Sequence, residues 1–263
     1  MGCVICPLRL ATVKLSFDEW DLARPRVSHT MLTIAHRGAS ALYPENTLRA
    51  FIGAVDAGAD LCEFDVRMTH DGEIVVIHDE TVDRTTDGHG PVATMSTSAL
   101  KRFDAGVRFG VGFSGERIPT LAEVAAALAG RCGMDVELKA NGLERRVCGI
   151  LQGCGAIESS ILSSFDWNQL KIAVQLAPGL RLALLAEKNS TVLLEAASAL
   201  HAHAIAPRFD IADAELCAEA HRRGLAVYAW TVDEESVMRR LIAAGVDGIM
   251  TNHPHRLREM LAN

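Results

Sequence analysis

The sequence is poor in aromatic residues and has no long hydrophobic run. Phe, Trp and Tyr make up 5% of its 263 residues, so aliphatic side chains and alanine must fill the core that a hydrophobic content of 49% allows. No run of 18 apolar residues occurs, which excludes an ordinary membrane-spanning helix. Near the start, Arg9, Lys14 and Asp18 interrupt the apolar stretch that a signal peptide needs, so we expect no leader.

Positive charge is also in short supply. The chain has 26 Lys and Arg residues against 33 Asp and Glu residues, a net charge of −7, and its basic residues form no stripe. We therefore expect neither a nucleic-acid partner nor an anionic membrane partner. An anionic substrate would need positive charge concentrated at one place, or a metal ion.

The cysteines do not form a disulfide framework. Seven are scattered along the chain, and this odd number predicts reduced thiols and a cytoplasmic protein. Cys3 and Cys6 have C-x-x-C spacing but lack the second pair that a zinc site would need. Because residues 1–30 show no clear hydrophobic period, we expect a poorly ordered N-terminal extension, followed by one domain over residues 31–263.

Beyond residue 31, short apolar runs alternate with amphipathic stretches that open with Asn, Asp or Pro-Thr and close with Gly, as helices do. We expect eight strands, at residues 32–35, 61–66, 134–138, 161–164, 181–185, 202–206, 226–231 and 248–251. Strands and helices in this alternation predict an α/β fold, the (β/α)₈ TIM barrel. The alternative, an open doubly wound sheet, would carry its usual Gly-rich phosphate loop after the first strand, and the sequence has none there.

One segment breaks the alternation after the second strand. Asp71 and Gly72 lie between two β-patterned runs and predict a two-residue hairpin turn, which would place Asp65 opposite His78. Residues 79–118 are rich in Asp, Gly and Thr, and we expect this insertion to form a small cap over the C-terminal mouth of the barrel. The sequence leaves the oligomeric state open, with the insertion as a candidate dimer contact.

Charged side chains gather at the ends of the early strands. Residues i and i+2 of a strand share a face, so Glu63 points with Asp65, and Glu137 points with Lys139. Barrel enzymes keep their active sites at the C-terminal ends of the strands. The side chains that we expect to converge there are His36, Arg37, Glu63, Asp65, His78, Glu137 and Lys139.

This set of side chains indicates phosphoryl transfer. Three carboxylates in one mouth repel one another unless a cation lies between them, and an all-oxygen set suits a hard divalent ion, either Mg²⁺ or Ca²⁺. An arginine and a lysine beside the metal provide positive charge for a phosphate group. Two histidines with pKa values near neutral can serve as general acid and general base.

Seven short blocks, in order between about residues 32 and 254, carry a family resemblance. They are AHRGASALYPENTLRAF, EFDVRMTHDGEIVVIHDETVDRTTDGHG, IPTLAEV, VELK, SSFD, AWTVD and GVDGIMTNHP. Together they resemble the glycerophosphodiester phosphodiesterases, and the first two blocks are the most specific. The resemblance implies a TIM-barrel enzyme that uses a divalent cation to hydrolyse a small glycerophosphodiester to sn-glycerol 3-phosphate and an alcohol.

The resemblance also assigns roles to individual residues. It implies metal ligands at Glu63, Asp65 and Glu137 and catalytic histidines at His36 and His78. It further implies contacts with the phosphate or the rest of the substrate, from Arg37, Lys139, Asn46, Phe165 and Trp230. The small members of the family that it resembles are cytoplasmic, in agreement with the cysteine pattern.

Two positions depart from the family pattern. Asp233 stands where Asn is frequent in the block WTVN, and Asn252 stands where Asp is frequent in the block TD-x-P. We expect both to lie away from the catalytic groups. Two other functions stay open: a lysophospholipase D-like or cyclising phosphodiester lyase on the same barrel, and a non-catalytic barrel that binds a glycerophosphodiester.

Overall fold

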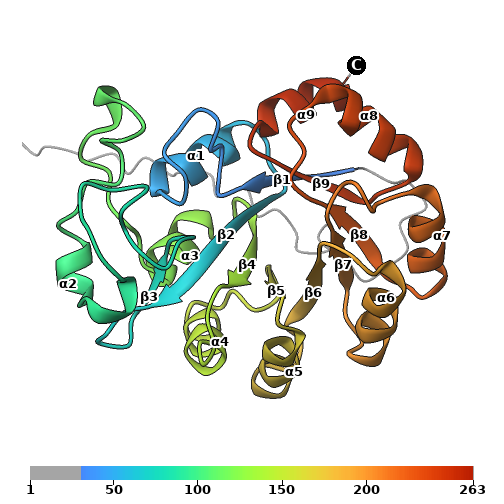
Figure 1. Ribbon diagram of the computed structural model, residues 1–263, viewed down its shortest axis with the longest axis horizontal. Helices are drawn as coiled ribbons and strands as arrows, with labels where there is room; N and C mark the ends of the chain where they lie inside the picture. Colours follow the sequence, from blue (N-terminus) through green and yellow to red (C-terminus); the bar gives the residue numbers. More distant parts are fainter. Residues whose placement is uncertain (1–30, 263) are drawn as a thin grey trace, which may run out of the picture.

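The computed structural model describes residues 31–262, which form a closed barrel of parallel strands (Figure 1). Strand β1 pairs with β2 on one side and with β9 on the other, and this double pairing closes the sheet. The TIM-barrel prediction is therefore confirmed, and the open-sheet alternative is wrong. The eight parallel strands are β1 (Leu32–His36), β2 (Leu61–Met68), β4 (Gly133–Leu138), β5 (Ser160–Ser164), β6 (Arg181–Ala186), β7 (Ala204–Pro207), β8 (Ala226–Ala229) and β9 (Gly248–Thr251).

Helices surround the barrel (Figure 1). Several begin where the sequence provides a cap: the side chains of Thr47, Asp166 and Asp213 each accept a hydrogen bond from a backbone N–H of the first turn. Thr120 and Glu123 form a reciprocal capping box. The helices of the ring are α1 (Leu48–Asp56), α3 (Leu121–Leu128), α4 (Glu144–Gly153), α5 (Trp167–Leu176), α6 (Ser190–Ala199), α7 (Ala214–Arg222), α8 (Glu235–Ala244) and α9 (Pro254–Ala262).

The strands bury both of their faces, as parallel strands do. One face packs against the helices in the larger core, which includes Phe51, Phe64 and Leu121. The other face forms a smaller apolar cluster that includes Ile34 and Leu61. Glu63 and Asp65 continue the Leu61 face of β2 toward its C-terminal end, so the polar site lies above this inner cluster.

The hairpin after β2 differs from the prediction by one residue. Strand β3 (Ile74–Val76) pairs antiparallel with β2, with Val66 opposite Val76, and the Ile77 N–H donates to the Asp65 carbonyl. Asp65 is therefore opposite Ile77, and the prediction that it faces His78 is wrong. The physical reason is a three-residue loop at 70–72, whose last residue, Gly72, has the positive φ of +81° typical of such loops.

The aspartate of this loop explains its length. The Asp71 carboxylate accepts hydrogen bonds from the Thr69 hydroxyl at 2.5 Å and from the Thr97 N–H at 3.0 Å. Asp71 thus connects the loop to the short helix α2 (Thr97–Leu100), because it accepts the backbone N–H of the first residue of that helix. Asp-Gly alone predicts a two-residue turn, but Asp71 bonds both locally to Thr69 and, 26 positions away, to Thr97, and these bonds favour the longer loop.

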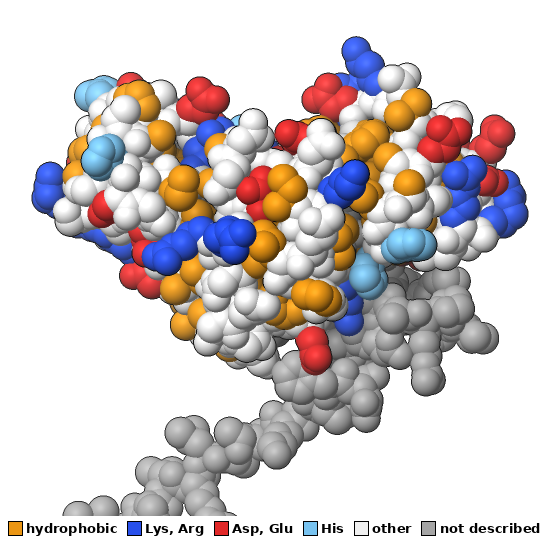
Figure 2. All heavy atoms as spheres, turned by 90° about the horizontal axis from the view of Figure 1, so that it is seen from below, with side chains coloured by type: hydrophobic (Ala, Val, Ile, Leu, Met, Phe, Trp, Pro, Cys, Tyr) orange, Lys and Arg blue, Asp and Glu red, His pale blue; other side chains and the backbone are white. Residues whose placement is uncertain are grey.

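Residues 79–118 form an insertion of turns, with α2 and two 3₁₀ turns (Val92–Thr94 and Val111–Phe113). A small apolar cluster that includes Val82, Val92 and Ile118 holds it against β3. The insertion lies on one side of the barrel, at the left of Figure 1. In Figure 2 it forms the left lobe, and the upper outline of the molecule dips between this lobe and the rest of the barrel.

Some sequence predictions fall outside what the structure describes or tests. The N-terminal extension and the pair Cys3 and Cys6 lie outside residues 31–262. The five cysteines within the described range are all free thiols. Across that same range, no helix combines the length and the hydropathy needed to cross a membrane. Cytoplasmic location stays a prediction, as does the insertion as a candidate dimer contact.

Candidate active site

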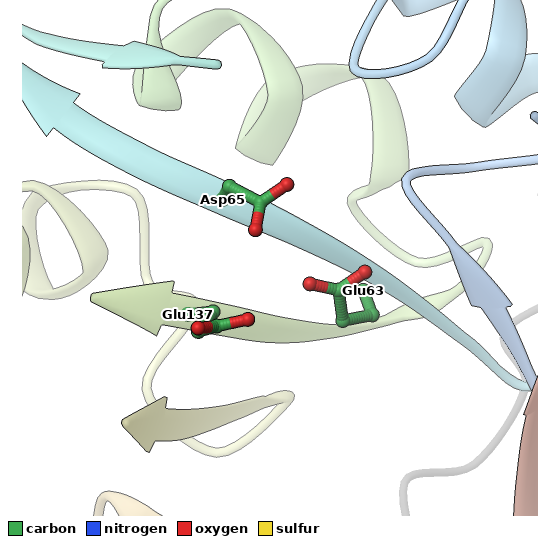
Figure 3. A group of neighbouring side chains, drawn as sticks. All are labelled: Glu63, Asp65 and Glu137. Atoms are coloured by element: carbon green, nitrogen blue, oxygen red, sulfur yellow. The ribbon is translucent and has the colours of Figure 1, made fainter. Parts of the chain in front are cut away.

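Three acidic side chains meet at the C-terminal ends of β2 and β4. Glu63 and Asp65 alternate along β2, and β4 pairs with β2 so that Glu137 lies directly beside Asp65. One carboxylate oxygen from each residue lies within 4.8 Å of the other two, and the carboxylates turn toward a common space (Figure 3). All three are buried, with exposed fractions of 2% for Glu63, 0% for Asp65 and 7% for Glu137.

The three carboxyl groups of this acidic cluster do not ionise equally easily, because each ionised group repels the others. Burial, followed by repulsion from Asp65, raises the pKa of Glu63 well above its ordinary range and the pKa of Glu137 to about 7. Burial also opposes ionisation of Asp65, but the nearby Lys139 and Arg37 outweigh it, and the pKa of Asp65 is lowered. Two raised carboxyl pKa values show that Lys139 and Arg37 do not offset all of the negative charge that three ionised carboxylates would carry.

The donor set fits a hard divalent cation. Glu63 Oε1 is buried and accepts no hydrogen bond from any residue in the described range 31–262. A buried carboxylate oxygen without a donor is costly, because burial removes the hydrogen bonds that water would supply. Oxygens from three carboxylates are the ligands that Mg²⁺ and Ca²⁺ prefer, so the residues predicted as metal ligands are brought together as a metal site would require.

Two cations border the acidic cluster, as the sequence predicts. Lys139 Nζ lies 2.5 Å from Glu137 Oε1 and 3.2 Å from Asp65 Oδ1. Arg37 Nε lies 3.3 Å from Asp65 Oδ2, while the Arg37 backbone N–H donates to Glu63 Oε2 at 3.0 Å. The backbone of Arg37 is left-handed, with φ +56°, where the chain turns directly after β1.

Asn46 lies within the site, where it orients Asp65. Its Nδ2 donates to Asp65 Oδ2 at 2.8 Å, and its backbone is also left-handed, with φ +58°. Two non-glycine residues in this conformation within one site indicate local strain that the surrounding contacts maintain. Asn46 therefore helps to fix the direction in which Asp65 presents its other oxygen.

The first predicted catalytic histidine, His36, ends β1 beside Glu63. Its Nδ1 lies 2.7 Å from Asn252 Oδ1. Burial, and then the positive charge of Arg37, lower the pKa of His36 to about 4. The imidazole is therefore neutral at pH 7 and able to accept a proton.

The second predicted catalytic histidine, His78, follows β3 and has a carboxylate partner. Its Nδ1 lies 2.6 Å from Asp79 Oδ1. Arg84, from the insertion, donates to Asp79 and also to Glu45, which in turn accepts from Arg37 at 2.9 Å. This chain of charges connects His78 to the opposite side of the acidic cluster.

Known proteins match this chain over most of its length. The model of the glycerophosphoryl diester phosphodiesterase family matches residues 36–256. A glycerophosphodiester phosphodiesterase of Caldanaerobacter subterraneus subsp. tengcongensis is 39% identical over 86% of this chain and 96% of its own length.

The chain belongs to the glycerophosphoryl diester phosphodiesterase family.

Solved structures of the family have the same architecture. A glycerophosphodiester phosphodiesterase from Agrobacterium tumefaciens superposes with a TM-score of 0.79 at 30% identity, over 88% of this chain and 100% of that one. A phosphodiesterase from Oleispira antarctica, in complex with the product sn-glycerol-3-phosphate, superposes with a TM-score of 0.83 at 28% identity, over 88% and 97%. The enzyme class implied by the resemblance, a glycerophosphodiester phosphodiesterase, is confirmed.

The two aromatic residues that the family resemblance assigns to the substrate lie side by side. The rings of Phe165 and Trp230 meet edge to face with centroids 5.4 Å apart, and Lys139 Nζ lies 5.8 Å from the centre of the Phe165 ring. Trp230 Nε1 donates to the Ala206 carbonyl at 2.6 Å, which fixes its indole. Phe165 is 45% exposed, so this pair forms an apolar wall next to the acidic cluster.

The expectation that Asp233 and Asn252 lie away from the catalytic groups is wrong. Asn252 is the direct partner of His36, and its Nδ2 donates to Asp233 Oδ2 at 2.7 Å. The sequence contains a signal of this contact: the two departures from the family pattern exchange Asn and Asp between the same two positions. A reciprocal exchange is typical of two residues in contact.

Four more residues at the site were not predicted from the sequence. Glu45, Asp79 and Arg84 join the two histidine sides of the site through side-chain bonds that depend on how the insertion folds. Asp135 shares the inward face of Glu137 and accepts from Ser163 at 2.6 Å, and burial raises the pKa of Asp135 to about 7. The i, i+2 pattern of β4 contains the signal for Asp135.

Proposed function

We propose that the protein hydrolyses glycerophosphodiesters to sn-glycerol 3-phosphate and an alcohol, with one divalent cation and two histidines as proton carriers. The observation that supports this most strongly is the acidic cluster, whose three buried carboxylates share one space next to His36 and His78. The product complex of the Oleispira antarctica relative supports the choice of product.

Glu63, Asp65 and Glu137 would hold the cation, and either Mg²⁺ or Ca²⁺ fits their oxygens. When bound, the cation supplies Lewis-acid polarisation of the phosphate and of a substrate hydroxyl. Lys139 and Arg37 border the same space and neutralise the charge of the phosphodiester. Phe165 and Trp230 provide an apolar surface for the carbon chain of the substrate.

The histidines carry protons through their Nε2 atoms, because Nδ1 of each already has a partner. A hydroxyl of the substrate's glycerol attacks phosphorus in line and gives its proton to one histidine. The other histidine protonates the departing alkoxide, and a cyclic glycerol phosphate forms. Water then opens the ring with the two roles reversed, which returns both histidines to their starting states.

Single substitutions of the histidines test this proposal. Each of His36→Ala and His78→Ala should lower the turnover of glycerophosphocholine by about 10²–10⁴-fold, as expected for loss of a general acid or base. Binding of Mg²⁺ or Ca²⁺, measured by calorimetry, should persist in both variants because neither residue belongs to the acidic cluster. Near-normal turnover in either variant would remove that histidine from the mechanism.

Phosphorus NMR of the wild-type reaction separates the hydrolase from its alternatives. Hydrolysis predicts that glycerol 3-phosphate accumulates as the final product. A cyclic phosphate that persists would assign the lyase reaction instead. Absence of turnover with every glycerophosphodiester, at saturating Mg²⁺ and Ca²⁺, would leave the binding barrel as the function.

A further inference from the structure

A hydrogen-bond chain behind His36 extends away from the acidic cluster to a partly buried acid. His36 Nδ1 contacts Asn252 Oδ1 at 2.7 Å, and Asn252 Nδ2 contacts Asp233 Oδ2 at 2.7 Å. Ser40 Oγ lies 2.7 Å from Asn252 Oδ1 and also 2.7 Å from the His36 carbonyl oxygen, and both of these oxygens accept from its hydroxyl. The three residues of the chain come from the ends of β1 and β9 and from the loop after β8.

The Asp233 carboxylate decides which way the Asn252 amide faces. Its Oδ1 accepts from the Asn252 backbone N–H at 2.9 Å and from the Thr251 hydroxyl at 3.0 Å. Burial disfavours ionisation of Asp233, but these hydrogen bonds and that of the Asn252 side chain outweigh burial, and its pKa is lowered. Because an ionised carboxylate only accepts hydrogen bonds, the Asn252 NH₂ group must face Asp233 and the amide oxygen must face His36.

The amide oxygen in turn decides where the neutral His36 ring carries its proton. An oxygen without hydrogen can only accept, so His36 Nδ1 must be the protonated nitrogen. The lone pair is then on Nε2, the nitrogen that the proposed mechanism uses to accept a proton. The second histidine differs, since His78 Nδ1 bonds directly to the carboxylate of Asp79.

We propose that Asp233 is a positioning residue that sets the tautomer of His36 through the Asn252 amide. The value of this tautomer for catalysis rests on the proposed function, but the tautomer itself can be measured without turnover. In this hydrogen-bond chain, Asn252 separates the carboxylate of Asp233 from the His36 imidazole, whereas the carboxylate of Asp79 bonds directly to His78. The Asn252 amide lies between the two, and Asp233 controls the orientation of this amide.

Asp233→Asn is the decisive variant. The introduced side-chain amide can satisfy the Asn252 N–H and the Thr251 hydroxyl with its oxygen, and it then presents an NH₂ group toward the Asn252 side chain. Asn252 must rotate its own amide to accept from that group, which turns the Asn252 NH₂ toward His36. The His36 proton should therefore move from Nδ1 to Nε2, and turnover should fall by about 10²-fold because the base no longer has its lone pair in place.

The readout is the ¹⁵N shift pattern of the His36 ring at pH 7.5 in the full-length, ¹⁵N-histidine-labelled protein. Comparison with His36→Gln, used only for assignment, identifies its signals. Wild type should give the Nδ1–H pattern and Asp233→Asn the Nε2–H pattern. The matched control is Thr251→Val, which removes one bond to Asp233 but leaves the amide orientation, so it should keep the Nδ1–H pattern.

The double variant Asp233→Asn/Asn252→Asp provides the rescue. In it, the amide at position 233 donates to the new carboxylate at position 252, and that carboxylate accepts from His36 Nδ1. The wild-type tautomer should return, and turnover should recover to within about tenfold of wild type, whereas a merely structural role predicts that two substitutions harm more than one. An unchanged tautomer in Asp233→Asn would overturn the proposal. An inverted tautomer with normal turnover would support the positioning but remove His36 Nε2 as a proton acceptor in the mechanism.

Discussion

Glu137→Gln should stabilise the metal-free protein above neutral pH while it removes the response to divalent cations. Glu137 is 7% exposed and lies beside Asp65, and burial together with this repulsion raises its pKa from 4.5 to about 7. The folded protein therefore retains a proton between these pH values that the unfolded chain has released. The stability that this proton contributes is fully present below pH 4.5 and is lost as the pH rises through 7.

The size of this effect follows from the interval between the two pKa values. From 4.5 to about 7, at about 1.4 kcal/mol for each pH unit, the free energy of unfolding changes by ~3 kcal/mol. Glutamine does not titrate, so the variant does not lose this stability as the pH rises. The free energy of unfolding of Glu137→Gln, relative to wild type, should rise by ~3 kcal/mol between pH 4.5 and pH 8.

The assay is urea unfolding in EDTA at several pH values, with wild type and variant compared at each. The comparison matters because the lowered pKa of His36 contributes in the opposite direction in both proteins and cancels in the difference. The attraction of Lys139 for ionised Glu137 is already part of the balance that sets the pKa of Glu137 to about 7, so it adds no separate pH dependence. Parallel curves for the two proteins would refute the reasoning.

Asp135→Asn serves as the matched control. Asp135 is also buried with a pKa raised to about 7, but it does not belong to the acidic cluster. Its variant should show a similar pH-dependent gain in stability in EDTA. It should still gain thermal stability on addition of Mg²⁺ or Ca²⁺, whereas Glu137→Gln should not, because that variant lacks a ligand oxygen.

Two further predictions concern the insertion and the entry to α1. Arg84→Met should lower kcat/KM by about tenfold with cation binding unchanged, because Asp79 and Glu45 lose the guanidinium group to which both bond. Arg84→Lys should recover only part of this loss. Equal activity in wild type and both variants would contradict the role of this contact. Gly38→Ala should destabilise the protein by at least about 3 kcal/mol in urea unfolding, since a Cβ would lie 2.6 Å from the Ala50 carbonyl carbon. Gly142→Ala, with the same φ of +83° and open space, should cost about 1 kcal/mol, and an equal loss in both variants would exclude the steric explanation.

The barrel and the core of the site could be predicted from the sequence because both depend on short-range periodicity. Alternation along a strand places Glu63 with Asp65, and parallel pairing of β2 with β4 then brings Glu137 beside them. The position of a residue at a strand end is enough to place it at the mouth of a barrel. These rules need no knowledge of side-chain packing.

The parts that failed depend on long-range contacts. The hairpin register differs from the prediction by one residue, and the loop that sets it includes Asp71, which bonds to Thr97, 26 positions away. The contact of His36 with Asn252 spans 216 positions and exists only when β9 closes the barrel against β1. The bond of Arg84 to Glu45 likewise requires the fold of the insertion, which has no strong period of its own.

The most direct test of the central claim is a calorimetric titration of Mg²⁺ and Ca²⁺ into the chelator-treated protein, with release of glycerol 3-phosphate measured on the same samples. We predict one ion bound per chain, activity in proportion to occupancy, and loss of both binding and activity in Glu63→Gln, because Glu63 Oε1 is a buried acidic-cluster oxygen that accepts no hydrogen bond in the described structure. Full turnover without any divalent cation, or unchanged cation affinity in Glu63→Gln, would contradict the account.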